Sequence, residues 1–172
     1  GDYIDRGHDS RRVVDLLLGA LPQGFDVHFL KGNHEAIMLD FLEDPSFLGQ
    51  WLANGADATF RSYGMDIEEL IRKGATPDTW QRAFLASLPE GHRDFFETLE
   101  LAVAFGDYLF VHAGVRPGVP LEAQDPHDLV WIRAPFLQSN ADFGKIVVHG
   151  HTPGREPVIR GNRIGIDTGA VF

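Results

Sequence analysis

The sequence contains no cysteine, carries little positive charge and has no long apolar run. The absence of cysteine excludes disulfide bonds and thiolate metal sites, although it does not by itself fix the cellular compartment. The 15 Lys and Arg residues are outnumbered by 25 Asp and Glu residues, and the resulting net charge of −10 argues against a nucleic-acid-binding protein, which needs a basic face. No run approaches the roughly 20 apolar residues of a membrane span, so we expect no membrane partner and a cytoplasmic protein.

The remaining composition is ordinary for a globular protein, with 44% hydrophobic and 23% charged residues. A chain of 172 residues can bury a proper core, and we expect residues 1–172 to belong to one domain. The chain does not begin with Met and ends abruptly at residues 169–172, Gly-Ala-Val-Phe. We therefore expect it to be a piece of a longer protein, incomplete at both ends.

Two short stretches that begin with glycine gather polar residues. They are residues 1–7, Gly-Asp-Tyr-Ile-Asp-Arg-Gly, and residues 32–35, Gly-Asn-His-Glu. Glycine lets the backbone turn sharply and bring side chains close to a small ligand. Taken alone, each stretch also fits a surface turn. Together they offer donors for a divalent metal and a planar guanidinium for a phosphate: Asp2, Asp5, Arg6, Asn33 and His34.

Helical and strand-like patterns alternate around these two motifs. Asp9 or Ser10 can cap a helix whose apolar residues recur at helical spacing. Residues 27–30 predict a buried strand that runs into residues 32–35, and residues 36–42 have helical spacing again. This order predicts an α/β domain, in which ligands collect where strands end and helices begin.

Residues 45–99 differ in character, because aromatic residues punctuate polar segments with mostly helical spacing. We expect a helical insertion beside the site rather than an independent domain. Aromatic residues mainly supply packing area, so we expect most of these to lie in a core and a minority to line a substrate pocket. They are Trp51, Phe60, Tyr63, Trp80, Phe84, Phe95 and Phe96.

The C-terminal half returns to strand patterns. Residues 101–105 and 108–111, separated by a turn that contains glycine, predict a hairpin that ends on His112. Residues 145–148 predict a buried strand that leads to His151. The other expected elements are a short helix at residues 125–133 and two strands at residues 157–160 and 163–166.

Four of these segments thus place a metal-ligand type of residue beside a glycine or two residues from one: Asp2, Asn33, His112 and His151. One histidine at a strand end is more often structural than a metal ligand. Two histidines in the same topological position as an Asp and an Asn reverse that expectation, since all four can converge on one sheet edge and bind a cation. The other histidines that we weighed are expected to be surface, packing or supporting residues: His28, His92, His127 and His149.

The motifs Gly-Asp-x-x-Asp-Arg-Gly, Gly-Asn-His-Glu, His-Ala-Gly and Gly-His-Thr resemble the bacterial branch of the PPP-type serine/threonine phosphatases, within the calcineurin-like metallophosphoesterases. The resemblance extends to Leu-Val-Trp-Ile-Arg at residues 129–133 and to residues 162–169. It implies an α/β fold, a four-layer α/β/β/α metallophosphoesterase sandwich with two metal ions at one edge.

The resemblance also implies a metal-ligand set. Asp2 would bridge two divalent metal ions, while Asn33, His112 and His151 would complete the second ion. Nitrogen and oxygen donors without sulfur favour manganese, which we expect, with iron or zinc as alternatives.

The same resemblance implies how the phosphoryl group is handled. Arg6 and Arg133 would bind the phosphate oxygens, His34 would be the general acid, and Asp5 would orient it. A hydroxide that bridges the metals would attack phosphorus directly, and the acid would protonate the leaving oxygen. The implied activity is phosphomonoester hydrolysis, with phosphoserine or phosphothreonine in proteins as substrate.

The sequence departs from this family in one respect. The family carries an earlier Gly-Asp-x-His-Gly motif, which supplies ligands to the first metal, and this chain begins after it. We therefore expect the first strand to be missing and this piece alone to be weakly active or inactive.

Two alternatives stay open. The substrate could be a small phosphoester instead of a phosphoprotein, as in a symmetrical dinucleoside polyphosphate hydrolase, because the same acid, arginines and metals serve either. A catalytically inactive binding or regulatory module is the alternative of another class. The retention of His34, Asp5, Arg6 and Arg133 together argues against an inactive module.

Overall fold

The computed structural model describes residues 1–19, 21 and 23–170. The described residues form two compact units, which we call the sheet unit and the helical unit and describe separately. The sheet unit comprises Gly1, His28–Asn33 and residues 100–170; the helical unit comprises Asp2–Val27 and His34–Leu99.

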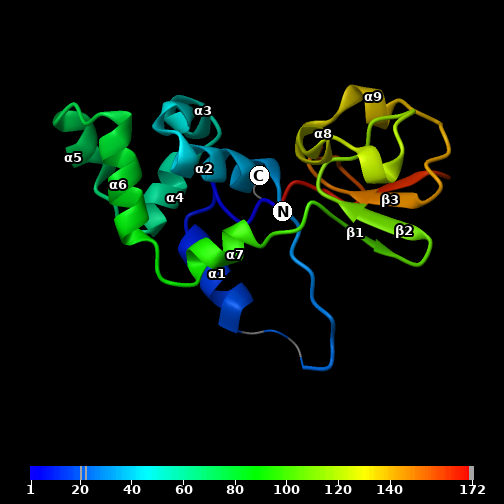
Figure 1. Cartoon of the computed structure of the whole chain (residues 1–172), viewed down its shortest axis with the longest axis horizontal. Helices are drawn as coiled ribbons and strands as arrows, with labels where there is room; N and C mark the ends of the chain where they lie inside the picture. Colours follow the sequence, from blue (N-terminus) through cyan, green and yellow to red (C-terminus); the bar gives the residue numbers. More distant parts are fainter. Residues whose placement is uncertain (20, 22, 171–172) are drawn as a thin grey trace. The chain divides into compact units, whose positions relative to one another are not determined.

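The sheet unit is built on one five-stranded sheet with the strand order β1-β2-β3-β5-β4 (Figure 1). Strands β2, β3 and β5 are parallel neighbours, whereas β1 and β4 pair antiparallel at the two edges. The hairpin and the three later strands predicted from the sequence are confirmed. Their bounds are β1 Ala102–Phe105, β2 Tyr108–Val111, β3 Ile146–His149, β4 Val158–Ile159 and β5 Arg163–Gly165.

Two α-helices cover one face of this sheet (Figure 1). The first of these helices is α8, Pro126–Trp131, which begins with a proline. The side chain of Asp125 caps it by accepting a hydrogen bond from the backbone nitrogen of His127 (2.8 Å). The short helices of the unit are η2 Leu121–Ala123, α8 Pro126–Trp131 and α9 Ala134–Leu137.

Strand periodicity explains the core of the sheet unit. Leu109 and Val111 alternate with exposed residues along β2 and are buried, and Val147 is fully buried on β3. These side chains pack in one cluster with Phe136 of α9. Gly114 contacts the same ring so closely that a Cβ there would lie 2.2 Å from its edge.

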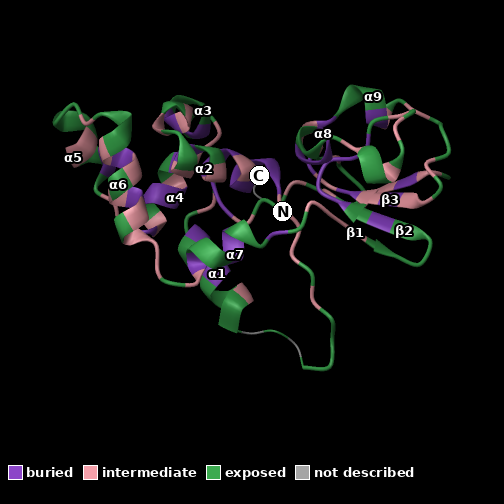
Figure 2. Ribbon diagram, in the orientation of Figure 1, coloured by how far each residue is buried: buried purple, intermediate pink, exposed green. Residues whose placement is uncertain are grey.

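The β1–β2 hairpin is largely exposed (Figure 2), and aromatic side chains lie on its face opposite the helices. Phe105 is 77% exposed, and Tyr108 and Phe110 are exposed on the same face. The predicted α/β class is confirmed, and the described residues contribute one mixed sheet to it.

The predicted buried strand at residues 27–30 is wrong. Only Leu30 forms a strand-like bridge, to Glu100, and His28 is exposed. The physical reason is that the segment has no continuous pairing partner among the described residues, and its histidine ring is held by the Glu100 carboxylate at 2.7 Å instead of packing in a core.

The helical unit is entirely helical within the described residues, apart from its connections. Two of its helices were predicted from the sequence: one begins at Ser10, and the other begins at Asn33, within residues 32–35. Their bounds are α1 Ser10–Gly19, α2 Asn33–Glu43, η1 Pro45–Phe47, α3 Leu48–Leu52, α4 Ala56–Ser62, α5 Ile67–Arg72, α6 Pro77–Ser87 and α7 His92–Glu97.

An aromatic cluster forms the core of the helical unit. Trp51, Phe60 and Phe84 are fully buried, and their rings meet edge to face with centroids 4.7 to 5.2 Å apart. The prediction that the aromatic residues of this segment are mostly core is confirmed, since the seven of them are all buried: Trp51, Phe60, Tyr63, Trp80, Phe84, Phe95 and Phe96.

A chain of polar contacts centred on the buried His92 ties three of these helices together. His92 at the start of α7 contacts the Tyr63 hydroxyl (2.9 Å) and the Asp15 carboxylate of α1 (3.0 Å). His92 is therefore a packing residue, as predicted. Among the described residues, no helix has the length and apolar character needed to cross a membrane.

Candidate active site

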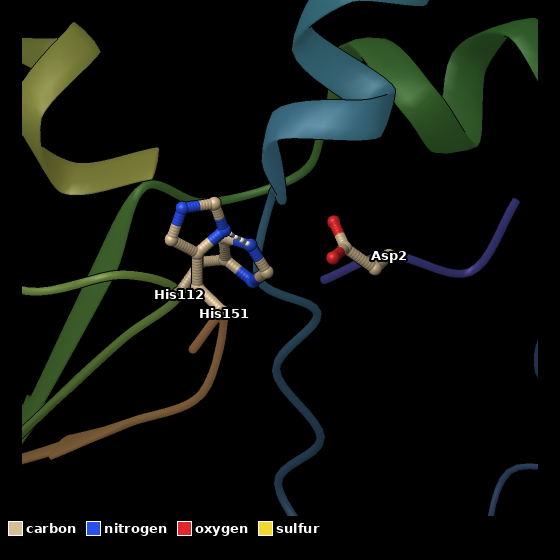
Figure 3. A group of neighbouring side chains, drawn as sticks. All are labelled: Asp2, His112 and His151. Carbon is tan, nitrogen blue, oxygen red and sulfur yellow. Dashed lines mark hydrogen bonds between the residues drawn. The ribbon is translucent and has the colours of Figure 1, made fainter. Parts of the chain in front are cut away.

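Two parallel strands deliver the histidines of the candidate metal site. His112 follows β2 directly, and His151 lies two residues beyond β3. Because β2 and β3 are parallel neighbours, their carboxyl ends lie at one sheet edge, and His112 Nε2 is 3.2 Å from His151 Nδ1 (Figure 3). Figure 3 draws these rings together with Asp2, which belongs to the helical unit and is described below.

Asn33 is the first residue of α2 and belongs to the sheet unit, and its side chain lies beside the two histidines. Its Oδ1 atom lies 3.0 Å from His112 Nε2. Donors that surround one cation octahedrally at about 2.1 Å are separated from their neighbours by about 3.0 Å. The observed separations of 3.0 and 3.2 Å therefore fit a shared divalent cation, and nitrogen and amide oxygen suit a transition metal.

Close backbone packing supports this ligand set. A Cβ on Gly1 would lie 2.4 Å from the Gly32 backbone nitrogen and 2.9 Å from His112 Nδ1, so the chain needs glycine at position 1. The backbone of Gly150 also donates to the carbonyl of His112 at 2.8 Å. These contacts hold the carboxyl ends of the two strands in fixed register.

Arg133 and Trp131 flank the second histidine. Arg133 Nε donates to His151 Nε2 at 3.0 Å, and the Trp131 ring meets the His151 ring edge to face with centroids 6.0 Å apart. Arg133 is exposed, so its guanidinium is accessible to a phosphate.

The helical unit holds the candidate acid. His34 Nδ1 lies 2.7 Å from Asp5 Oδ2, and both side chains are buried. The Trp51 indole donates to both Asp5 oxygens at 2.9 and 3.1 Å, and the Thr59 hydroxyl donates to Asp5 Oδ1 at 2.7 Å. The Asp5 backbone nitrogen in turn donates to Thr59 Oγ1 at 2.8 Å. The carboxylate is thus fixed before it orients the imidazole.

The environment favours the protonated form of His34. Burial lowers its pKa, but the hydrogen bond that His34 donates to Asp5 and the negative charges of Asp2 and Asp5 outweigh burial, and the net effect raises the pKa above its ordinary value of 6.5. A histidine that keeps its proton near neutral pH is suited to act as a general acid.

Glu35 holds the backbone of residues 1–7, the first of the two glycine-led motifs, in place. Its two carboxylate oxygens accept hydrogen bonds from the backbone nitrogens of Asp2 (2.8 Å) and Tyr3 (2.7 Å), and the side chain is fully buried. Desolvation, followed by the charge of Glu35, raises the pKa of Asp2 to about 6, although Asp2 as a whole is exposed. A bound cation would favour the ionised form of this carboxylate.

Arg6 lies on the surface of the helical unit beside Asp5. Its backbone nitrogen donates to the Gly55 carbonyl at 3.2 Å, and a Cβ on Gly55 would lie 2.8 Å from the Arg6 side chain. The guanidinium is exposed and has no ion pair among the described residues, so it is available to an anion.

Backbone strain marks the same residues. The non-glycine residues with positive φ in the described part of the chain are Asp2 (63°), Asp5 (72°), Arg6 (60°) and His151 (62°). Left-handed backbone is unfavourable for residues with a Cβ, and such conformations concentrate at functional sites. Every one of the four belongs to the set of candidate residues chosen from the sequence.

Sequence reasoning missed two supporting residues. Thr59 and Trp51 hold Asp5, and they come from the helical segment in which no motif marked them. Glu35 was within a motif, but its role in supporting the first loop required the fold. His149 does not join the metal-ligand group: it is buried, and its ring packs against Phe136 with centroids 4.9 Å apart.

Comparison with known proteins identifies the family. The profile described as calcineurin-like phosphoesterase matches residues 1–169. The chain belongs to the calcineurin-like phosphoesterase family. Its members use divalent metal ions to hydrolyse phosphoesters, so the protein is a metal-dependent phosphoesterase.

Two relatives narrow the comparison. The asymmetrical bis(5'-nucleosyl)-tetraphosphatase PrpE of Anoxybacillus flavithermus (strain DSM 21510 / WK1) is 23% identical over 192 residues, which cover 100% of this chain and 69% of PrpE. A crystal structure provisionally described as a diadenosine tetraphosphatase matches with a TM-score of 0.64 at 20% identity, over 99% of this chain and 69% of its own. That likeness supports the α/β metallophosphoesterase fold. Neither relative is described as a protein phosphatase.

Proposed function

We propose that the protein hydrolyses dinucleoside polyphosphates. The observation that carries this proposal is the similarity of the whole chain to a bis(5'-nucleosyl)-tetraphosphatase, combined with an acid and phosphate-binding set that suits phosphoester cleavage. The proposal replaces phosphoproteins, which the motif resemblance first suggested, with a small-molecule substrate.

The metal ions would be held by Asn33, His112 and His151, whose donor atoms are spaced for one cation, and by Asp2. When bound, they would supply an activated water and Lewis-acid stabilisation of the phosphoryl oxygens. If His151 bound a metal ion through Nδ1, its ring proton would lie on Nε2, and the Arg133 guanidinium, which donates to that atom here, would be released to the substrate.

The remaining residues act on the leaving group and on charge. His34, held as an imidazolium by Asp5, gives its Nε2 proton to the oxygen that leaves phosphorus. Arg6 and Arg133 neutralise the phosphate oxygens, which matters in a protein with a net charge of −10. An inactive binding module would not need a buried carboxylate to orient a histidine.

The test is a substrate comparison with manganese. The natural full-length protein, with this 172-residue chain in parallel, is incubated with diadenosine tetraphosphate, a phosphoserine peptide and p-nitrophenyl phosphate, and the products are separated by anion exchange. We expect diadenosine tetraphosphate to have the highest kcat/KM, with the 172-residue chain weakly active or inactive. Two molecules of ADP would indicate symmetrical cleavage, and ATP with AMP would indicate asymmetrical cleavage.

Paired variants connect this activity to the site. His34→Asn should lower kcat by about 100-fold or more, whereas His8→Asn, at an exposed histidine near the first motif, should not. Preference for the phosphopeptide would contradict the proposal and restore the protein-phosphatase interpretation. Binding of the substrates without turnover by the full-length protein would support the inactive module.

A further inference from the structure

Helix α8 carries two aromatic rings beside the candidate metal site. His127 and Trp131 are four residues apart on this helix and therefore share one face. Their rings are nearly parallel, with an interplanar angle of 21° and centroids 6.1 Å apart. The N-terminal cap by Asp125 fixes the turn that bears His127.

The Trp131 indole connects this pair to the phosphate-handling residues. Its ring lies 6.0 Å from the ring of His151, whose Nε2 is bonded to Arg133. An aromatic surface thus adjoins both a metal-ligand residue and a guanidinium, all within the sheet unit.

Packing does not account for the two rings. The buried residues of α8 are Asp128, Leu129 and Val130, whereas His127 is exposed and Trp131 is only half-buried. In contrast, Trp51 and Trp80 are 0% and 4% exposed. Stacked rings that stay accessible beside a polar site resemble the platforms on which nucleobases stack.

A polar hollow continues from the His127 end of this surface. It has a volume of about 360 Å³ and is lined by His127, Arg116, Asp125 and Asp128, among others. Arg116 is paired with Asp128 through both Nε and Nη2, which holds the two charged groups in a fixed arrangement. Carboxylate oxygens here can accept hydrogen bonds from ribose hydroxyls or from an exocyclic amine of a base.

We propose that Trp131 and His127 form a stacking surface for a nucleobase of the substrate, with the adjoining hollow receiving the rest of that nucleoside. This inference rests on the proposed function, and it assigns substrate preference to α8. Base–aromatic stacking contributes about 5- to 150-fold in affinity per base, which is enough to separate a nucleotide from a simple phosphoester.

Tryptophan fluorescence tests the surface directly, without catalysis. The chain has three tryptophans, and Trp131 is the accessible one, since the other two are buried. The part of the emission of the manganese-loaded full-length protein that is lost in Trp131→Phe should be quenched by AMP at lower concentration than by ribose 5-phosphate, which carries the same phosphate and sugar without the base. Equal responses to the two ligands would overturn the proposal.

Variants then link the surface to substrate choice. The ratio of kcat/KM for diadenosine tetraphosphate to that for glycerol phosphate should fall about 5- to 150-fold in Trp131→Leu and less in Trp131→Phe, which keeps a ring. Phe105→Leu removes an equally apolar but remote ring, 77% exposed, and should leave the ratio unchanged.

Each failure has a distinct meaning. An equal loss on both substrates in Trp131→Leu and in His127→Ala would show a structural role and contradict the stacking surface. If Trp131→Leu does not fold, His127→Ala and the wild-type AMP titration decide. If the full-length protein does not hydrolyse diadenosine tetraphosphate, the proposed function fails, whereas discrimination between AMP and ribose 5-phosphate still tests the surface.

Discussion

Replacement of Asp5 by asparagine probes the group on which the candidate acid depends. The Asp5 carboxylate accepts from three donors, since His34 and Trp51 contact Oδ2 and Thr59 contacts Oδ1. An asparagine side chain has one oxygen and one NH2 group in the same space. With the NH2 group at the Oδ2 position, His34 and Trp51 would face another donor; with it at the Oδ1 position, the Thr59 hydroxyl would lose its acceptor.

The structure sets the expected magnitudes. A buried donor left without an acceptor costs about 1–3 kcal/mol, so Asp5→Asn should lower the free energy of unfolding by that amount. Loss of the carboxylate also removes the charge that holds the His34 proton. Because general acid catalysis contributes about 100- to 10,000-fold, the activation barrier should rise by about 2.7–5.4 kcal/mol.

The pH dependence of kcat should show in which direction Asp5 shifts the pKa of His34. In the wild type, Asp5 raises the pKa of His34, so the acid form persists above pH 6.5 and kcat falls only at higher pH. In Asp5→Asn this limb should move to lower pH, because burial alone lowers the pKa of an imidazole. Asp78→Asn, an exposed carboxylate of the helical unit, is the matched control and should change neither kcat nor the limb.

The assay measures kcat from pH 5 to 9 with p-nitrophenyl phosphate and with phenyl phosphate. The loss in Asp5→Asn should be larger for phenyl phosphate, because phenol, with a pKa of about 10, is the poorer leaving group and needs the proton more. A variant that keeps wild-type kcat, or that loses the same factor on both esters with no shift of the limb, would refute the role of Asp5 and His34 as an acid pair.

Three further outcomes follow from the packing and the ionisation of the site. Glu35→Gln should weaken manganese binding about 10- to 100-fold by titration calorimetry, because one backbone nitrogen of the first motif loses its acceptor, whereas exposed Glu43→Gln should not. Gly114→Ala should lower unfolding stability by about 1–3 kcal/mol or more in urea, since its Cβ would lie 2.2 Å from a buried ring, while Gly161→Ala has open space. In the metal-free protein, the protonated His34 should stabilise the fold fully below pH 6.5, and this contribution should decline as the pH rises through the raised pKa of the folded state. Urea midpoints measured across this pH range test this expectation.

The sequence predicted the features that depend on local pattern. Strand-forming runs before His112 and His151 placed both histidines at carboxyl ends, and parallel pairing of β2 and β3 brings such ends together. The glycines of the two motifs indicated tight backbone approach, which the contact between Gly1 and Gly32 shows. Chemistry that is written into short motifs could therefore be found without the fold.

Long-range contacts could not be predicted in this way. Thr59 and Trp51 reach Asp5 from positions 54 and 46 residues away, and helical periodicity gives no sign of such contacts. The segment at residues 27–30 shows the opposite error, because an apolar composition typical of strands does not supply a pairing partner. Trp131 was noted only as part of a motif, since its partial exposure depends on how α8 packs.

The left-handed residues give an independent argument that this arrangement is functional. A residue with a Cβ in the left-handed region costs roughly 1–2 kcal/mol, so the four of them together cost about 4–8 kcal/mol, a large part of the 5–15 kcal/mol that stabilises a typical domain. Glycine would remove this cost at each position, and the chain uses glycine freely elsewhere in left-handed turns, as at Gly64 and Gly74. Asp2, Asp5, Arg6 and His151 instead keep side chains that can bind a metal, orient an acid or meet a phosphate. Stability alone does not explain that choice, whereas the roles proposed for these side chains in phosphoester hydrolysis do.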